Sequence, residues 1–422
     1  MNRLKLIFPM WIFNRMQIVF VVIISLIVSF FNILYAAQTD VLTLYFSADR
    51  TTTRASAISI EQGIKTALSE IDNHLGGYPV VLKILDHRGS TPRAKKHLQA
   101  YLRDPSALVL FSGIHSPPLL ASREYINTRG ILVLDPWAAA APITRYPSKM
   151  NWIFRLSVDD SKAGFVITEH AVTQEGVRKP ALLLEQTGWG KSNKRTMTKA
   201  LEARNLTPTS VKWFNWGLSL ESARILLREI NLAKADAVFL VANTPEAKII
   251  SQAMASLPKN ERLPIFSHWG VSGGDFAEVV VPEIRKEIKL CFIQSSFSFL
   301  DKLNSFQQGV LEQAYHLFPE TITRPTDIKA PTGFIHAYDL TRLLIAAAEK
   351  VDMNTHAEVR RAALRNAFEN LDSPIQGLIK TYVKPFSVFS ESNPDAHEAL
   401  GMDDFRMARF GPQNEIILLS ND

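Results

Sequence analysis

The chain has 422 residues, of which 46% are apolar and 21% are charged. This composition is typical of globular proteins and excludes the disordered, collagenous and coiled-coil classes. The formal charge is +6, but the acid-free residues 1–37 contain Arg3, Lys5 and Arg15, so the surplus in the rest of the chain is too small to predict nucleic-acid binding. The single cysteine, Cys291, excludes an internal disulfide, a cysteine-based zinc site and an iron–sulfur cluster.

The first 37 residues carry the charge order of an exported chain. Residues 18–37 form an uncharged, mostly apolar run about as long as a bilayer is thick, and the basic residues precede it. Two interpretations remain open: a cleaved signal peptide, or a retained N-terminal membrane anchor with its positive charges inside. Cleavage is favoured because Ala36 and Ala37 end the run and the polar Gln38 follows. Either way, the globular part is expected in the periplasm.

Strands and helices alternate from residue 41 onward. Short runs rich in β-branched residues predict strands over 41–46, 80–85, 107–111 and 131–134. Helical periodicity predicts helices between them, over residues 60–75, 92–102 and 116–127. A Pro- and Ala-containing loop at 135–151 interrupts the pattern before a connecting strand at 152–156. This alternation is typical of βαβ units around a parallel sheet.

A second round of the same pattern follows. It predicts strands over 181–184, 209–214, 237–241 and 264–266, with helices over 159–174, 191–203, 220–232 and 245–257. Residues 289–297, which include Cys291, are expected to form an extended connector. Helices are then expected over 306–318, 338–351 and 356–370, and short strands over the last 50 or so residues. The predicted fold class is therefore α/β, with two doubly wound parallel-sheet lobes.

Enzyme motifs occur in the chain but lack their usual context. Gly270-Val271-Ser272-Gly273-Gly274 matches the G-x-S-x-G turn of serine hydrolases, and Ser272 is the nucleophile that this alternative requires. However, His268 and Trp269 separate the motif from the preceding strand. His397-Glu398 begins an H-E-x-x-H zinc motif, but Gly401 replaces the second histidine. The sequence therefore predicts no catalysis, no cofactor and no metal site.

Several short motifs occur together in a recognisable order. They are Ile60-Glu61-Gln62-Gly63-Ile64, Glu70-Ile71-Asp72-Asn73, Gly76-Gly77, Phe154-Arg155, Asp159-Asp160-Ser161-Lys162-Ala163-Gly164 and Trp189-Gly190. In this order and spacing the chain resembles the leucine/isoleucine/valine-binding family of type I periplasmic binding proteins, over about residues 41–377.

The resemblance implies two lobes that are joined by three crossovers and close on a small ligand. The crossovers would lie at 154–156, at 292–297 and near 372–377. Residues 38–155 and 294–372 would then form the first lobe, and residues 156–293 and 373–422 the second. Such a receptor would deliver its ligand to the membrane permease of an ABC importer. The alternative is a ligand-sensing module of a membrane signalling protein.

The resemblance also implies a set of ligand-binding residues at the carboxyl ends of strands. Ser116, which fits a helix N-cap, matches the family's carboxylate-binding serine. The remaining expected ligand-binding residues are Ala138, Ala139, Ala140, Trp189, Asn243, Thr244 and Trp269. The family usually has Thr where this chain has Ala140, and an acid where it has Trp269. A free α-amino acid is therefore a doubtful ligand. The candidate ligands are amino-acid-like molecules, amides, and apolar or aromatic acids.

We predict that the mature protein begins between Ala37 and Asp40, because small residues end the apolar run. Intact-mass measurement on protein from the native host checks this prediction. A full-length, membrane-bound chain would instead establish the anchor.

Overall fold

The structure is a computed structural model that describes residues 41–420. The predicted signal peptide or anchor lies outside the described residues. Within residues 41–420, no helix combines the length and the hydropathy needed to cross a membrane.

The first lobe contains a six-stranded sheet in the order β2-β3-β1-β4-β5-β6, and only β2 runs antiparallel to its neighbour. Its strand β1 is buried along its whole length, which explains its mostly apolar sequence, interrupted only by Thr43 and Ser47. The strands are β1 (Leu42–Ala48), β2 (His74–Leu75), β3 (Tyr78–Asp86), β4 (Ala107–Ser112), β5 (Val133–Asp135) and β6 (Ile153–Arg155). The helices are α2 (Arg54–Ser69), α3 (Thr91–Arg103), α4 (Ser116–Arg129), α11 (Ser305–Leu317), α12 (Pro331–Ala348) and α13 (Ala357–Glu369).

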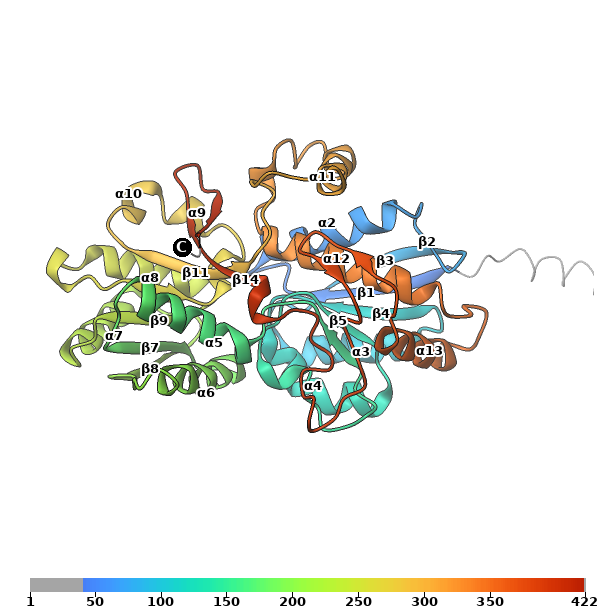
Figure 1. Ribbon diagram of the computed structural model, residues 1–422, viewed down its shortest axis with the longest axis horizontal. Helices are drawn as coiled ribbons and strands as arrows, with labels where there is room; N and C mark the ends of the chain where they lie inside the picture. Colours follow the sequence, from blue (N-terminus) through green and yellow to red (C-terminus); the bar gives the residue numbers. More distant parts are fainter. Residues whose placement is uncertain (1–40, 421–422) are drawn as a thin grey trace, which may run out of the picture. The chain divides into compact units, whose positions relative to one another are not determined.

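The second lobe contains a seven-stranded sheet in the order β15-β14-β11-β10-β9-β7-β8. Its strands are β7 (Pro180–Glu185), β8 (Val211–Phe214), β9 (Ala237–Val241), β10 (Ile265–Ser267), β11 (Leu290–Ser295), β14 (Phe405–Phe410) and β15 (Ile416–Leu418). The helices are α5 (Asp160–Glu169), α6 (Gly188–Glu202), α7 (Leu220–Leu232), α8 (Thr244–Ser256), α9 (Phe276–Val279) and α10 (Pro282–Arg285). A π-helical turn at His170–Gln174 extends α5. Figure 1 shows the two lobes, with the C-terminal segment passing from one to the other.

Both lobes repeat one strand order. Each sheet contains five parallel strands, in the order β3-β1-β4-β5-β6 in the first lobe and β8-β7-β9-β10-β11 in the second. Counted along the chain, the second of these five strands comes first in both sheets, followed by the first, third, fourth and fifth. Doubly wound sheets of this order bind ligands at the carboxyl ends of their strands. The predicted α/β class with two doubly wound lobes is confirmed.

The end of the chain differs from the prediction. Residues expected in an extended connector form β11, an internal strand of the second sheet that contains the buried Cys291. The hairpin of β12 (Ile375–Gln376) and β13 (Thr381–Tyr382) remains with the first lobe, because Tyr382 donates a hydrogen bond to Asp339 of α12. The chain enters the second sheet only at β14. The lobe boundary expected at residue 373 is thus corrected to the segment just before Phe405.

Two helices of the first lobe approach each other closely at a glycine. Gly63 of α2 faces α12, and a Cβ atom there would lie 2.2 Å from the carbonyl oxygen of Phe334. Such a distance is shorter than any real contact, so only glycine permits this helix packing. The sequence motif around Gly63 therefore has a packing function.

We predict that Gly63→Ala lowers the free energy of unfolding by about 1–3 kcal/mol, because α2 and α12 must separate to admit the methyl group. Gly309→Ala in α11 is the matched control, since no atom lies within 4 Å of its added Cβ. The control should stabilise the protein by about 0.5–1 kcal/mol. Thermal unfolding of both variants tests this account, and equal melting temperatures would contradict it.

Candidate functional site

The carboxyl ends of the two sheets lie opposite each other, and side chains from both lobes make contact there. The backbone N–H of Ala141 in the first lobe donates to Ser192 Oγ in the second, at 3.1 Å. The rings of Trp137 and Trp269 lie 5.5 Å apart, and those of His115 and Trp216 lie 5.4 Å apart. The structure therefore shows the two lobes closed on each other.

The alanine loop, residues 138–140, follows β5 in the first lobe. Asp135 Oδ1 accepts a hydrogen bond from the backbone of Ala138 at 2.8 Å, and burial raises the pKa of this carboxyl to about 6. Ser116 Oγ accepts a hydrogen bond from the backbone of Ala140 at 3.2 Å. The cap expected at Ser116 is corrected, because His115 occupies the N-cap position and Ser116 is the first helical residue. The Ser116 hydroxyl thus joins α4 to the alanine loop.

Trp189 lies at the start of α6 and is only 4% exposed. Its indole Nε1 donates to Asp160 Oδ1 at 3.1 Å, and Asn193 Nδ2 donates to the same oxygen at 2.8 Å. His268 Nε2 lies 3.1 Å from that oxygen as well, and its ring meets Trp189 edge-on at 5.2 Å. The backbone N–H of Asp160 donates to Ala139. The predicted wall residue Trp189 is thereby placed beside the alanine loop.

Trp269 follows β10 and is 1% exposed. Its ring contacts Trp137 of the first lobe and lies 5.2 Å from the ring of His336 in α12. Burial lowers the pKa of His336 to about 3, so this ring is neutral near pH 7. Trp269 therefore reaches across the cleft into the first lobe.

The other two predicted second-lobe residues begin α8. Asn243 Nδ2 donates to Glu185 Oε2 at 3.2 Å, and burial raises the pKa of that carboxyl. Thr244 Oγ donates to the carbonyl of Gly270 at 3.0 Å, which ties α8 to the loop after β10. Gly270 lies between this pair and Trp189, because a Cβ atom there would be 3.0 Å from both Asn243 Oδ1 and the Trp189 ring.

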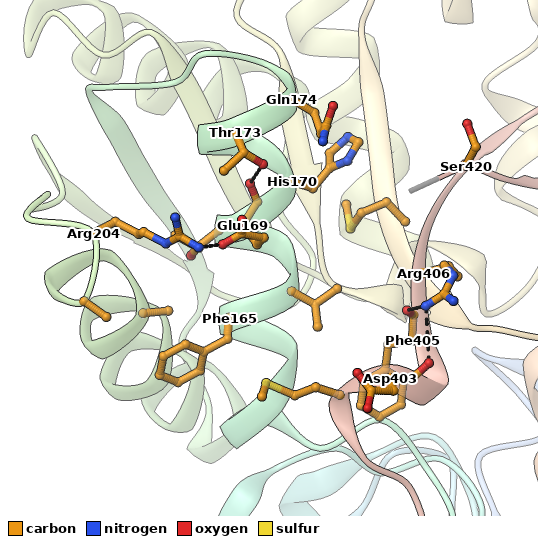
Figure 2. Close-up of a pocket in the computed structure, with 16 residues that line it drawn as sticks. Phe165, Glu169, His170, Thr173, Gln174, Arg204, Asp403, Phe405, Arg406 and Ser420 are labelled. Atoms are coloured by element: carbon orange, nitrogen blue, oxygen red, sulfur yellow. Dashed lines mark hydrogen bonds and ion pairs between the residues drawn. The ribbon is translucent and has the colours of Figure 1, made fainter. Parts of the chain in front are cut away.

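A pocket of about 500 Å³ opens between the lobes beside this region. The β1–α2 loop contributes Thr51, Thr52 and Thr53, and the second lobe contributes Thr244 and Gly273–Asp275. A separate pocket of about 510 Å³ lies outside the cleft, between α5 and the segment around β14 (Figure 2). Of the eight predicted ligand-binding residues, only Thr244 lines the first of these two pockets, and none lines the second.

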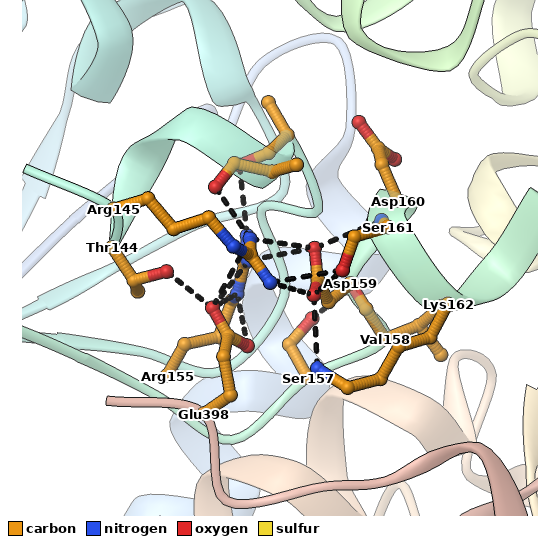
Figure 3. Close-up of polar contacts among 12 residues, drawn as sticks. Thr144, Arg145, Arg155, Ser157, Val158, Asp159, Asp160, Ser161, Lys162 and Glu398 are labelled. Carbon is orange, nitrogen blue, oxygen red and sulfur yellow. Dashed lines mark hydrogen bonds and ion pairs between the residues drawn. The ribbon is translucent and has the colours of Figure 1, made fainter. Parts of the chain in front are cut away.

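A network of six charged side chains surrounds the first crossover, and we call it the hinge ion network. Its members are Arg145, Arg155, Lys162, Asp159, Asp395 and Glu398. Figure 3 labels its members other than Asp395. Arg155 is fully buried and lies 2.6 Å from Glu398 and 3.1 Å from Asp159. Lys162 of α5 pairs with Asp395 of the C-terminal segment at 3.0 Å. Burial opposes the charge of Asp159, but the three cations outweigh it and hold its pKa below the ordinary value.

The structure does not support the hydrolase alternative. Ser272 is 1% exposed, its Oγ donates to the carbonyl of Trp269 at 2.7 Å, and Gln294 donates to that Oγ. No histidine is hydrogen-bonded to this hydroxyl, so nothing is placed to activate it. Across the part of the chain that the structure describes, no group of three His, Cys, Asp or Glu residues is arranged to hold a metal ion.

Sequence reasoning missed several residues of the cleft: Trp137, Asp160, Asn193, His268 and His336. The Asp159-Asp160 pair was visible within a family motif, but no sequence signal separates the two carboxylates. His336 lies on α12, in an apolar stretch of sequence that predicts burial in the core rather than a site residue. Its contact with Trp269 depends on lobe closure, which no local pattern reveals.

Comparisons with known proteins agree on one family. Residues 46–267 match the model of a family described as periplasmic binding protein. A periplasmic binding protein type 1 from Bordetella pertussis Tohama I is 14% identical, with a TM-score of 0.75 over 90% of this chain and 99% of that chain. A leucine binding protein from Thermotoga maritima MSB8 is 13% identical, with a TM-score of 0.70 over 90% and 98% of the two chains.

A solute binding protein of an ABC transporter from R. palustris, solved in complex with benzoate, is also similar. It is 16% identical, with a TM-score of 0.71 over 90% of this chain and 95% of that chain. At such identities these likenesses establish the type I fold alone. No curated protein matches the chain.

We predict that Glu398→Gln lowers the free energy of unfolding by about 3 kcal/mol, because it leaves the buried Arg155 guanidinium partly unpaired. Glu391→Gln is the control, since this exposed carboxylate of the same segment makes no ion pair among the described residues. Denaturant unfolding of both variants at neutral pH gives the comparison. A Glu398→Gln protein as stable as the control would show that the network contributes little.

Proposed function

This chain belongs to the periplasmic binding protein family, and from that membership we propose that it is an extracytoplasmic solute receptor. It closes two lobes on a small molecule and delivers that molecule to the membrane permease of an ABC importer. The family is one of solute-binding proteins rather than enzymes. The observation that carries the proposal is that Asp160 links the alanine loop to Trp189, while Trp137, next to that loop, contacts Trp269 across the lobes.

The candidate ligands are amino-acid-like molecules, amides and apolar or aromatic acids. The solute binding protein solved with benzoate and the leucine binding protein, both similar in fold, support this size class. Two indoles supply a large apolar surface, against which a flat or branched body can be buried. No observation on residues 41–420 favours the sensory alternative, so the importer role is the one retained.

A thermal-shift screen with amino acids, amides, urea and aromatic acids tests the proposal. A ligand at about 100 times its dissociation constant stabilises the folded state by about 2.7 kcal/mol, so a true ligand raises the melting temperature in a concentration-dependent way. A complete absence of stabilisation across these classes would contradict the proposed solute class.

We predict that Trp189→Ala weakens binding of a ligand found in that screen by about 1–3 kcal/mol, as expected for the loss of a buried aromatic contact. Trp189→Phe keeps a ring but loses the N–H that bonds Asp160, so its loss should be smaller. Calorimetric titration on the folded variants measures both effects. If Trp189→Ala melts early but binds normally per folded molecule, the residue belongs to the core and the site lies elsewhere.

A further inference from the structure

Asp160 is a fully buried carboxylate without a cationic side chain beside it. Its neighbour Asp159 pairs with Arg145, Arg155 and Lys162, whereas only His268 lies within ion-pair distance of Asp160. Figure 3 shows Asp160 turned away from the hinge ion network. Two adjacent aspartates thus have opposite electrostatic surroundings.

His268 does not supply the missing positive charge. The backbone N–H of Trp269 donates to His268 Nδ1 at 3.0 Å, so Nδ1 is an acceptor and the ring is neutral, with its proton on Nε2. His268 Nε2 lies 3.1 Å from Asp160 Oδ1, which accepts hydrogen bonds from Trp189 and Asn193, but Nε2 itself has no hydrogen-bond partner among the described residues. The other oxygen, Oδ2, is buried and has no hydrogen-bond partner among the described residues. The N-terminus of α5 offsets part of this charge, but an unpaired buried carboxylate remains costly.

Two more partnerless acceptors lie around the two cleft tryptophans. Asn193 Oδ1 is buried without a partner, because its Nδ2 is the group that bonds Asp160. His336 Nδ1 faces the carbonyl of Pro136, which can only accept, so the partnerless Nε2 of this neutral ring is an acceptor too. Trp137 Nε1 and His268 Nε2 are the partnerless donors in this group. Acceptors therefore outnumber donors among these partnerless atoms, and no lysine or arginine of the described residues pairs with Asp160.

We infer that the solute carries a cationic nitrogen group, an ammonium or an amidinium, on a compact apolar body. Its N–H groups would donate to Asp160 Oδ2 and Asn193 Oδ1, and its body would lie against Trp189 and Trp269. Indole faces also attract cations. This inference rests on the proposed function, since it assumes that the solute binds in the cleft.

Matched pairs of probes with opposite head groups test the inference on the full chain. Benzamidinium and benzoate share a ring, and isoamylammonium and isovalerate share a branched chain. We expect the cation of at least one pair to bind at least tenfold more tightly than its carboxylate partner, as measured by calorimetric titration. Tighter binding of the carboxylates, or no binding by either cation, would overturn the inference. A chain that binds and closes on benzoate would contradict the inference while supporting the proposed function.

Asp160→Asn is the informative variant, because it removes the charge and keeps the shape. We expect at least a tenfold loss of affinity for the cationic probe, together with an empty protein at least as stable as the wild type. Asp403→Asn, at an exposed position just before β14, is the control and should bind normally. Unchanged cation affinity in Asp160→Asn would overturn the assignment. If this variant fails to fold, the paired probes on the wild-type chain still decide.

Discussion

The fully buried guanidinium of Arg155 connects three parts of the molecule that are distant in sequence. It donates to the carbonyls of Ala138 and Ala140 in the alanine loop, pairs with Glu398 of the C-terminal segment and lies beside Asp159 at the crossover. A charge can be buried only when it is paired and its donors are used. These partners accept the hydrogen bonds of the Arg155 N–H groups. Arg155 therefore fixes the alanine loop, the crossover at Asp159 and the C-terminal segment at Glu398 relative to one another.

The backbone around Arg155 strengthens this connection. Its N–H donates to the carbonyl of His397, and its carbonyl accepts from Ala399, so residues 397–399 run beside β6 as a further extended segment. Asp159 caps α5 by accepting from Ser161, and α5 is the first helix of the second lobe. The residue at which the second lobe begins, Asp159, is therefore ion-paired with Arg145 and Arg155 of the first lobe. Since Asp159 takes all three cations, Asp160 is left to face the cleft without one.

The sequence predicted the α/β class and both lobes because their signals are local. Period-two and period-3.6 patterns mark strands and helices wherever one face is buried, and the alternation of the two implies parallel sheets. The same signals indicated an extended segment at 289–297 with Cys291 as a buried strand residue, but a connector and a sheet strand look alike as short apolar runs, so they did not show that β11 is internal to the second sheet.

The features that could not be predicted depend on long-range contacts. His397-Glu398 was rejected as a zinc motif, and its actual role beside Arg155 requires a pairing across more than half of the chain. The boundary near 373 failed for the same reason, because nothing local shows that the tail stays with the first lobe until Phe405. The aspartates at 159 and 160 differ only in what folding places beside them.

The central claim is that the two lobes close on a solute at the site between the alanine loop and Trp189. Small-angle scattering of the full protein, with and without a solute that stabilises it, tests this most directly. The account predicts a smaller radius of gyration at saturation, and a Trp189→Ala protein that stays open at the same solute concentration. An unchanged radius of gyration, in a protein shown to be open when empty, would contradict it.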